Sequence, residues 1–496
     1  MYDVLIIGSG VSGASCAYML SKYDLKVAVL DKSNDIANGT TKANSAIINA
    51  GFDPSPDTLM AKLNVRGVEL AREIAAKLDV PINNCGSLVL AFDDGDLEHI
   101  RKLYDRGCKN NVPGLELLDK EQLHALEPGI SDAAVGALLA PSACIINPWE
   151  YCLAMAETAV RNGVELFLGT EVQGITKAED GSFILQCGSR TFKSKYVLSA
   201  CGVDCDKTRS FLEEPEYEIV PTRGQYFLLD KEEGKRVSRT IFQCPNEKGK
   251  GVLVSPTVDG NLIVGPDAII GDREDKSTDK AGLDAIKEAA CKSVPKVNFR
   301  KNIRNFAGIR ANSKSGDFII EESKAFPGFI DMAGIKSPGL TAAPAIAEYV
   351  IGMLADDGLP LIIKEEFVDE RTRPRLPVAG HIGGGGRIYS KEEADAIRNE
   401  KIAQDPSYGR IICRCETVTE GEIKEALHGP IPPVSINAVK RRVGAGLGRC
   451  QGGFCMPKVQ ELIVKELGID WLDVCLEEPG SETLSYRTKA NAGKED

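Results

Sequence analysis

Several kinds of feature are missing from this chain, and each absence excludes a class of protein. Its 496 residues contain no run of eighteen apolar residues, so we expect no membrane-spanning helix. The net charge of −12 argues against a nucleic-acid partner, because phosphate binding requires clustered Lys and Arg. Outside one glycine-rich stretch, no internal repeat or low-complexity segment is present. The chain is too long for one core, and we expect two to four domains.

Histidine is also scarce, since the chain holds only His99, His124, His381 and His428. His99 and His124 lie in charged, helix-like segments that we expect to be exposed. No histidine stands out as a general base, the role that this side chain most often has in catalysis.

Cysteine, in contrast, is abundant. Fifteen are present, an odd number, and eleven of them have no regular spacing. The N-terminus enters an apolar stretch within three residues, which leaves no room for a signal peptide. We therefore expect reduced thiols in a cytoplasmic protein that meets a membrane only through a partner.

The chain opens with the pattern of a dinucleotide-binding unit. Apolar strands are predicted over 2–7 and 26–30, with a helix between them that ends near residue 22. The turn before the helix reads Gly8-Ser9-Gly10-Val11-Ser12-Gly13, and Asp31 ends the second strand. Strand, glycine turn, helix, strand and acid together predict a nucleotide site; a glycine turn in an ordinary strand–helix–strand unit is the alternative.

Each part of this turn has a mechanical role. Gly8 permits the tight turn, Gly10 lets a pyrophosphate approach the backbone, and Gly13 lets helix and strand pack closely. The helix N-terminus offers N–H groups and partial positive charge to the phosphates. Asp31 is placed to accept hydrogen bonds from the adenosine ribose.

Two later segments favour FAD over NAD as the nucleotide. A strand over 195–200 runs into Cys201-Gly202, a second close approach to the nucleotide region. Another strand, over 328–333, is followed by Gly334–Thr341 and a helix over 342–354. Glycines and a proline before a helix aim backbone N–H groups outward, where they stabilise negative charge on a reduced flavin. A plain loop leading into a helix is the alternative for this segment.

Four cysteines near the C-terminus have a spacing that indicates a metal centre: Cys413, Cys415, Cys450 and Cys455. Four thiolates satisfy either zinc or an iron–sulfur cluster, and free redox thiols are a third alternative. Zinc sites usually have two CxxC pairs with a shorter spacer. The glycine-rich run over 444–448 favours a [2Fe–2S] cluster, because its backbone N–H groups are able to bond to the sulfurs. Thr419 and Glu422 predict a capping box for a helix beside the first pair.

Several motifs resemble the D-amino-acid-oxidase superfamily of FAD enzymes. They are the GSGVSG turn, the segments Thr40–Ser45 and Ala307–Ala311, and the SPGLT sequence over 337–341. The similarity covers roughly residues 1–370 and is strongest to anaerobic glycerol-3-phosphate dehydrogenase large subunits and to L-2-hydroxyglutarate dehydrogenases. For the former it extends through the cysteines, which resemble a bacterioferritin-associated-ferredoxin-like [2Fe–2S] domain.

The resemblance implies an α/β protein with a glutathione-reductase-like FAD-binding domain, an inserted antiparallel-sheet substrate domain and a small iron–sulfur domain. The FAD-binding domain is expected over 1–80, 141–220 and 305–370, the substrate domain over 81–140 and 221–304, a linker over 371–408 and the [2Fe–2S] domain over 409–480. Residues 251–254 and 261–264 are predicted to form a hairpin of the substrate domain.

The resemblance also implies which residues contact FAD. They are Gly8, Gly10, Val11, Ser12, Gly13, Asp31, Lys32, Thr40, Thr41, Asn44, Ser45, Val172, Ala200, Gly202, Gly308, Gly334, Ile335, Gly339, Leu340 and Thr341.

Substrate chemistry is assigned to two arginines and their neighbours. Arg310 and Arg223, with Tyr226 nearby, are expected to bind a carboxylate or phosphate by paired hydrogen bonds. Relatives commonly have a histidine where Asn49 stands, and an asparagine accepts no proton at neutral pH. Lys336 is an alternative base, provided that its pKa is depressed.

Three functions remain open. The first is an FAD dehydrogenase of a small anionic 2-hydroxy compound, glycerol 3-phosphate above all, which passes electrons through the [2Fe–2S] cluster. The second is a dehydrogenase of L-2-hydroxyglutarate or of an amino or imino acid. The third, suggested by Asn49, is an electron-transfer subunit without catalysis. Each requires a downstream acceptor, either a protein or a membrane quinone system reached through partner subunits.

Overall fold

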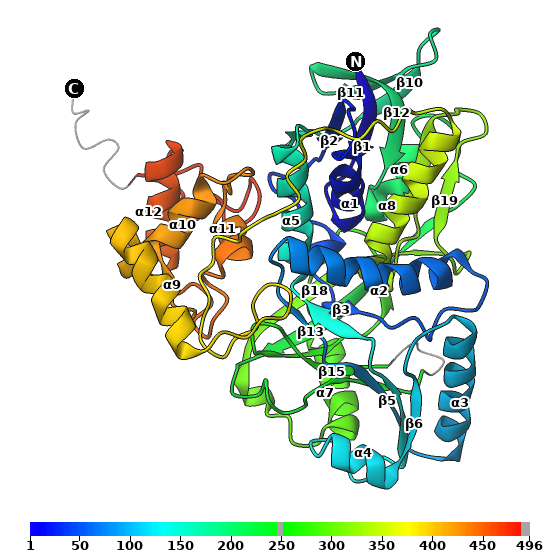
Figure 1. The fold of residues 1–496 in the computed structure, drawn as a ribbon, viewed down its shortest axis with the longest axis vertical. Coiled ribbons are helices and arrows are strands. Elements are labelled where there is room, and N and C mark those ends of the chain that lie inside the picture. The colour runs from blue at the N-terminus through cyan, green and yellow to red at the C-terminus, as the bar shows by residue number, and fades with distance from the viewer. Residues whose placement is uncertain (246–250, 488–496) are drawn as a thin grey trace. The chain divides into compact units, whose positions relative to one another are not determined.

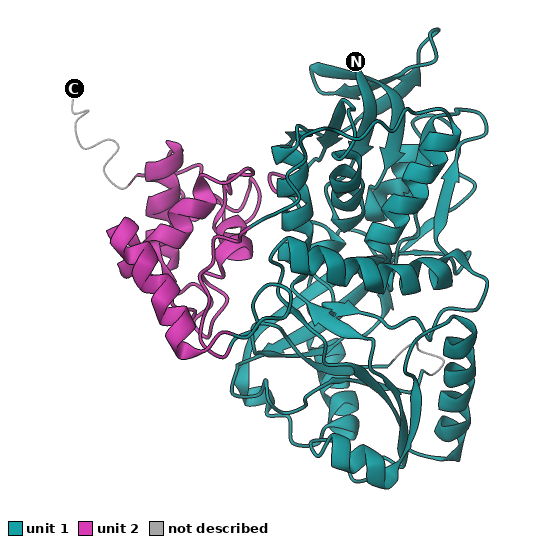
Figure 2. Ribbon diagram, in the orientation of Figure 1, with its two compact units in different colours: residues 1–32, 36–371, 381–388 teal, residues 33–35, 372–380, 389–496 magenta. Residues whose placement is uncertain are grey.

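The computed structural model describes residues 1–245 and 251–487, which form two compact units (Figure 2). Unit 1 comprises residues 1–32, 36–371 and 381–388, and unit 2 comprises 33–35, 372–380 and 389–496. Within the described ranges, no helix has both the length and the apolar character needed to cross a bilayer.

Unit 1 contains an eight-stranded sheet that includes the N-terminal strand (Figure 1). In this sheet β1 lies between β12 and β2 and runs parallel to both, as the opening motif predicts. β20 pairs in parallel with the end of β12, and β9 pairs in parallel with β2. The strands are β1 (Tyr2–Ile7), β2 (Val27–Leu30), β9 (Glu165–Phe167), β10 (Gly174–Lys177), β11 (Phe183–Cys187), β12 (Arg190–Ser199), β19 (Ile319–Glu322) and β20 (Phe329–Ala333).

Long helices pack around this sheet. α1 packs against α5 and α8, and α2 packs against α8. α1 is apolar on all sides, and every residue in it except Ser12 is buried, as expected for a helix enclosed by others. The bounds are α1 (Val11–Leu20), α2 (Leu59–Lys77), α5 (Pro148–Arg161) and α8 (Gly339–Asp356).

The second large sheet of unit 1 has nine strands and is mainly antiparallel. Its longest strands, β13 and β18, pair along their whole length, and β15 and β16 form the predicted hairpin. The pair β14 and β5 is parallel, a departure from the antiparallel sheet that we expected. The strands are β5 (Ser87–Ala91), β6 (Glu116–Asp119), β7 (Gly136–Ala140), β13 (Ile219–Leu229), β14 (Thr240–Gln243), β15 (Leu253–Pro256), β16 (Leu262–Gly265), β17 (Ile269–Ile270) and β18 (Asn302–Ser313).

Three helices accompany the second sheet, and unit 1 also contains a small sheet and the short helix α6 (Cys205–Arg209). α7 contacts β13, β14, β15 and β16, and α3 and α4 contact β6 and β7. The helices are α3 (Asp94–Lys109), α4 (Lys120–Leu126) and α7 (Lys280–Ser293), and the small sheet is β3 (Ile47–Ile48), β8 (Cys144–Ile146) and β4 (Ile82–Asn83).

The described residues of unit 2 form four α-helices and one short strand pair around an apolar core. The capping box at the start of α10 is formed by Thr419 and Glu422 as predicted. The elements are α9 (Lys391–Gln404), β21 (Ile411–Cys413), β22 (Val418–Thr419), α10 (Glu420–Leu427), α11 (Ile436–Val443) and α12 (Met456–Leu467).

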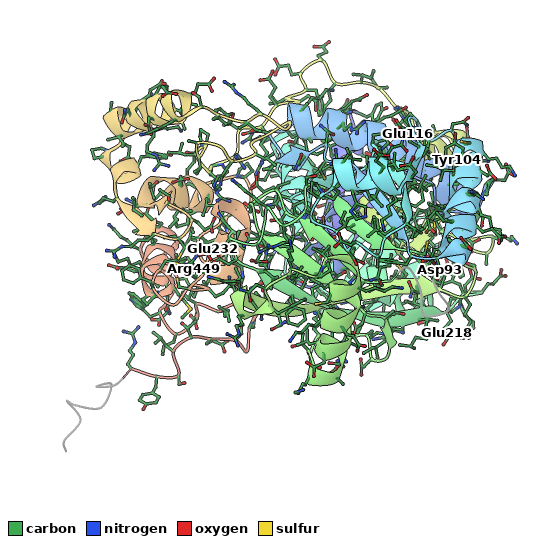
Figure 3. The ribbon with its side chains drawn as sticks, turned by 90° about the horizontal axis from the view of Figure 1, so that it is seen from below. Asp93, Tyr104, Glu116, Glu218, Glu232 and Arg449 are labelled. Atoms are coloured by element: carbon green, nitrogen blue, oxygen red, sulfur yellow. The ribbon has the colours of Figure 1, made fainter. Side chains whose placement is uncertain are left out.

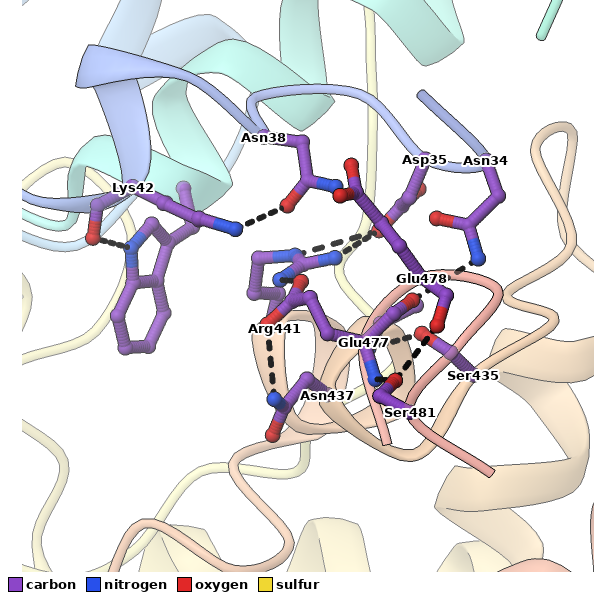
Figure 4. A network of polar contacts seen from close by, with 12 residues as sticks. Asn34, Asp35, Asn38, Lys42, Ser435, Asn437, Arg441, Glu477, Glu478 and Ser481 are labelled. Carbon is purple, nitrogen blue, oxygen red and sulfur yellow. Dashed lines mark hydrogen bonds and ion pairs between the residues drawn. The ribbon is translucent and has the colours of Figure 1, made fainter. Parts of the chain in front are cut away.

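Unit 2 also includes a segment from the N-terminal part of the chain. Asp35 accepts hydrogen bonds from Arg441 Nη2 and Arg442 Nη2, each at 2.8 Å (Figure 4). Asp35 and Arg442 are each about 1% exposed, so this ion pair is shielded from water. Although burial opposes ionisation, the two arginines lower the pKa of Asp35 to about 2. Asn34 adds a hydrogen bond to the Glu477 carbonyl at 2.9 Å.

Three local expectations need correction. α8 begins at Gly339, three residues before the predicted start. The stretch over 371–408, expected as a linker, contains helix α9. His99 and His124 are partly buried rather than exposed, because each lies on a helix that packs beneath the second sheet.

Candidate active site and metal centre

The turn between β1 and α1 leaves no space for side chains at two of its glycines. A Cβ on Gly13 would lie 1.9 Å from the Gly8 carbonyl oxygen. A Cβ on Gly8, which has φ of +101°, would lie 2.5 Å from the oxygen of Ala200. At Gly10 a Cβ would meet only Thr41 Oγ1, at 3.4 Å. The tight turn at Gly8 and the close packing at Gly13 that the sequence predicts are therefore present, and Gly10 faces a more open space.

Helix N-termini distinguish the candidate cofactor sites from the rest of the chain. Among the described helices of eight residues or more, only α1, α8 and α12 begin without a backbone N–H that donates to an N-cap side chain. Each of the others has a Ser, Thr, Asp or Asn cap. An uncapped N-terminus presents N–H groups and partial positive charge to an anion. The N-cap residues of these three helices are Gly10, Pro338 and Cys455.

The end of β2 places the carboxylate of Asp31 against the glycine turn. Asp31 Oδ2 accepts hydrogen bonds from the Ser9 backbone and hydroxyl, both at 2.6 Å. Thr170 N–H donates to the Asp31 carbonyl at 2.7 Å, which brings the loop containing Val172 to the same place. Lys32 forms an ion pair with Asp204 at 2.9 Å, two residues beyond Gly202.

The Thr40–Ser45 segment joins the nucleotide turn to the second sheet. Val11 N–H donates to Thr41 Oγ1 at 3.0 Å, and Thr40 Oγ1 donates to the Ile309 carbonyl at 2.6 Å. A Cβ on Gly308 would lie 1.9 Å from the oxygen of Ala43, so β18 runs directly against this segment.

Asn44 and Ser45 fix the far end of this segment. Asn44 Nδ2 donates to the Thr41 carbonyl at 2.8 Å, and its Oδ1 accepts from Ala46 N–H at 2.7 Å. Ser45 Oγ lies 3.1 Å from the hydroxyl of Tyr226. The ring of Tyr226 stacks on Phe306, with centroids 4.8 Å apart, and this stacking orients the hydroxyl.

The start of α8 meets the segment that contains Asn49. Asn49 N–H donates to Thr341 Oγ1 at 2.9 Å, and Asn64 Nδ2 donates to the Asn49 carbonyl at 2.8 Å. Gly67 of α2 permits this approach, because a Cβ there would lie 2.2 Å from the Thr341 oxygen. Sequence reasoning missed Gly67, since a glycine in a helix gives no local signal of its distant neighbour.

The two arginines expected to bind substrate lie on paired strands but differ in their partners. In the β13–β18 register, Thr222 pairs with Arg310 and Arg223 pairs with Ile309. Arg310 is half-buried over Gly224, and its Nη2 donates to the Asp267 carbonyl at 2.7 Å. Within residues 1–245 and 251–487, no carboxylate lies within ion-pair distance of it.

Arg223 is already neutralised. It forms ion pairs with Asp275 at 2.6 Å and Asp279 at 2.7 Å. Sequence reasoning missed these two aspartates and also Gln225, which is fully buried and donates to Asp267 Oδ2 at 2.7 Å. Nothing in their spacing connects them with Arg223. Arg310 therefore has the greater capacity to bind an additional anion.

The structure does not identify a histidine as the general base. Asn49 is half-buried beside Thr341, and Lys336 is half-buried in the turn before α8, where its N–H donates to the Gly334 carbonyl at 2.8 Å. His99 lies on α3, and its Nε2 is enclosed with no hydrogen-bond partner among the described residues. His124 lies on α4, and its Nε2 contacts the Ala134 carbonyl at 3.3 Å.

The four C-terminal cysteines form two sulfur pairs. Cys415 Sγ and Cys450 Sγ are 3.7 Å apart and exposed. Cys413 and Cys455 are buried in the core of unit 2. A hydrogen bond from Cys455 lowers the pKa of the Cys413 thiol to about 6, and burial opposes this effect. Nowhere in the described chain do three or more potential ligands converge as they would on a single metal ion.

Two pairs of thiolates fit a [2Fe–2S] cluster, in which four cysteines bind two irons. The backbone N–H groups of Gly446 and Glu416 bond to the Cys413 sulfur, as the glycine-rich flank predicts. A glycine is needed at position 448, next to the exposed pair Cys415 and Cys450. A Cβ on Gly448 would lie 2.3 Å from Cys415 Cβ. The uncapped start of α12 at Cys455 adds partial positive charge beside the thiolates.

Comparison with known proteins agrees with both sites. Residues 3–353 match the FAD dependent oxidoreductase family, and residues 411–465 match the BFD-like [2Fe-2S] binding domain. A glycerol 3-phosphate dehydrogenase of Caloramator mitchellensis is 46% identical over 492 residues, which are 99% of each chain. An L-2-hydroxyglutarate dehydrogenase of Escherichia coli strain K12 is 27% identical over 393 residues, 71% of this chain and 92% of the relative.

A solved structure shows the same fold. The L-alpha-glycerophosphate oxidase of Mycoplasma pneumoniae with FAD bound is 33% identical, with a TM-score of 0.71 over 74% of this chain and 98% of that one. The chain described here therefore belongs to the FAD-dependent oxidoreductase family, with FAD as its cofactor and a C-terminal domain that binds a [2Fe–2S] cluster.

Proposed function

We propose that the protein is a dehydrogenase of glycerol 3-phosphate and that the electrons leave through the [2Fe–2S] cluster to a separate acceptor, either a protein or a membrane quinone system reached through partner subunits. The similarity to the Caloramator mitchellensis enzyme over 99% of both chains supports this substrate. The observation that carries the proposal is Arg310, a half-buried guanidinium without a carboxylate partner among the described residues, on the strand that docks against Thr40–Ser45.

Each residue group would then have a separate task. The glycine turn and the uncapped starts of α1 and α8 hold the dinucleotide. Arg310 binds the substrate phosphate with its remaining N–H groups, and Arg223 adds a weaker attraction because two aspartates already pair with it. When bound, the flavin supplies the chemistry of hydride acceptance from a carbon that carries a hydroxyl.

The proton of that hydroxyl needs an acceptor. Asn49 is able to hydrogen-bond the hydroxyl and orient it but takes up no proton at neutral pH. We assign proton uptake to Lys336, in the turn before α8. Tyr226, oriented by Phe306 and Ser45, completes the polar lining.

The substrate is tested by anaerobic bleaching of the flavin absorbance with glycerol 3-phosphate, L-2-hydroxyglutarate, L-lactate, L-proline and sarcosine. We expect bleaching by glycerol 3-phosphate at the lowest concentration. L-2-hydroxyglutarate is the second candidate, supported by the 27% identical relative. Bleaching by that compound in place of glycerol 3-phosphate would replace the substrate assignment, and silence across the panel would contradict it.

The role of Arg310 as the substrate anchor is tested by replacing arginines on β18 and β13. Arg310→Ala should lower the second-order rate constant of flavin bleaching about hundredfold, the cost of losing charge-assisted hydrogen bonds, while FAD stays bound. Arg304→Ala, on an exposed position of the same strand, is the matched control and should keep the wild-type rate. Arg223→Ala should have the smaller effect. An unchanged rate in Arg310→Ala would remove the anchor assignment.

A further inference from the structure

The loops that carry the four cysteines have an unusual distribution of charge. Among residues 413–417 and 444–458, the charged side chains are Arg414, Glu416, Arg449 and Lys458. Glu416 is buried, 4% exposed, and forms an ion pair with Arg375 at 3.0 Å. The exposed charges on these loops are therefore all positive, in a chain whose net charge is −12.

An aromatic ring lies between two of these cations. Phe454, directly before Cys455, is 49% exposed. The Arg414 guanidinium stacks 4.7 Å from its centroid, and Lys458 Nζ lies 5.8 Å from it. Arg449, which directly precedes Cys450, is also exposed. It is labelled in Figure 3. We call Arg414, Arg449, Phe454 and Lys458 the basic collar.

The collar surrounds the part of the metal centre that reaches the surface. Cys415 and Cys450 are exposed, whereas Cys413 and Cys455 are buried. Electrons can leave only where another redox centre comes close to a ligand, and these two sulfurs are the accessible ones on unit 2. Exposed aromatic and arginine side chains are also the residue types enriched at protein interfaces.

We propose that the basic collar is the docking surface for an acidic protein that carries a one-electron centre. Charge complementarity selects such a partner, because carboxylates around its redox centre would be attracted to the exposed cations Arg414 and Lys458 and would repel the acidic remainder of this chain. The substrate loses two electrons and two protons, so two carrier molecules each accept one electron here and the protons pass to water. The proposal rests on the proposed function only in requiring that electrons leave through the cluster.

Two haem proteins of opposite charge serve as probes: an acidic b-type cytochrome and a basic c-type cytochrome. The holoprotein is photoreduced without substrate, so the result does not depend on glycerol 3-phosphate. We expect the acidic cytochrome to bind more tightly by calorimetry and to be reduced faster, with both effects weakening as salt rises. Salt-independent binding, or preference for the basic cytochrome, would overturn the proposal.

Charge reversal places the interaction on the collar. Arg414→Glu with Lys458→Glu should weaken binding of the acidic cytochrome about tenfold or more, since like charges then face each other. Lys465→Glu is the matched control, because Lys465 is exposed on the same face of α12, two turns or about 10 Å further along. An equal loss in the control would contradict the assignment.

A second arm distinguishes an external partner from unit 1. If the double reversal slows reduction of the cluster by the flavin and leaves cytochrome binding unchanged, the collar serves internal transfer and the proposal fails. Retention of the cluster's visible absorbance checks that the variant is intact. If the double variant loses this absorbance, Lys458→Glu alone and the salt titration of the wild type decide whether the basic collar is the docking surface.

Discussion

The nucleotide site of unit 1 and the cluster site of unit 2 are built in opposite ways. The nucleotide site uses backbone groups and glycines from segments as distant as Gly8 and Thr341, and side chains mainly hold those segments together. The cluster site uses four cysteine side chains from two loops, Cys413–Cys415 and Cys450–Cys455. What the two share is a helix N-terminus without an N-cap hydrogen bond, which favours a nearby negative charge. A site built from backbone groups should tolerate replacement of the side chains around it but not a larger residue at a glycine. A site built from side-chain ligands should tolerate a change of volume better than the replacement of a ligand.

The sharpest test of this contrast is the addition of a side chain at the glycine turn. Gly13→Ala places a Cβ 1.9 Å from the Gly8 oxygen. The backbone must shift in the core of the sheet, and we expect the free energy of unfolding to fall by about 5 kcal/mol, with loss of FAD. Denaturant unfolding and flavin absorbance measure both effects. Gly10→Ala is the companion variant, because its Cβ meets only Thr41 Oγ1 at 3.4 Å; it should fold normally and bind FAD more weakly. Equal stability of the two variants would contradict the assigned roles.

A side-chain change at the cluster should leave unit 1 intact. Cys450→Ser removes one exposed ligand, and we expect loss of the cluster absorbance and of electron transfer to one-electron acceptors. Bleaching of the flavin by substrate should continue at the wild-type rate. Cys108→Ser, at another exposed cysteine, controls for thiol replacement. If Cys450→Ser also abolished bleaching, the two sites would not be separable.

The contrast between the two sites has one exception. Unit 2 depends on Asp35, a residue that is distant from the rest of the unit in the sequence. Asp35→Asn leaves Arg442 buried without its counter-charge, and we expect unit 2 to lose about 3 kcal/mol of stability near neutral pH. The folded pKa of Asp35, about 2, lies below its usual value of 3.8. Its contribution is therefore complete above the unfolded pKa and is lost as pH falls towards 2.

The measurement is urea unfolding of wild type and Asp35→Asn, followed by the cluster absorbance from neutral pH downward. The difference between the two proteins should shrink as the acid is protonated. Asp473→Asn, in the same unit, is the control for removing one exposed carboxylate. A difference that persists unchanged at the lowest pH would exclude the ion pair as its source.

Local sequence signals predicted a large part of this architecture. The β1–α1–β2 opening, the hairpin β15–β16, the capping box at Thr419 and the four clustered cysteines follow from spacing over a few residues. Each depends on turn chemistry or periodicity that neighbouring residues determine by themselves.

Other features depend on contacts between distant segments and gave no local signal. Examples are the parallel pairing of β14 with β5, the aspartates that neutralise Arg223, and the approach of Gly67 to Thr341. Helix α9 was hidden because the prolines and glycines that precede it indicated an irregular linker. The candidate flavin and substrate residues were named from family resemblance. Their contacts with each other come from the fold.

The segment 33–35 has a consequence for how such proteins are assembled from parts. An iron–sulfur module placed at the end of a chain would ordinarily be expected to move between proteins as one continuous piece. Here a fragment beginning at residue 372 would lack the acid that accompanies Arg441 and Arg442. Grafting this module onto another flavoprotein therefore requires a host with an aspartate in the loop after its second strand. Residues 33–35 must therefore accompany the C-terminal module in any such transfer.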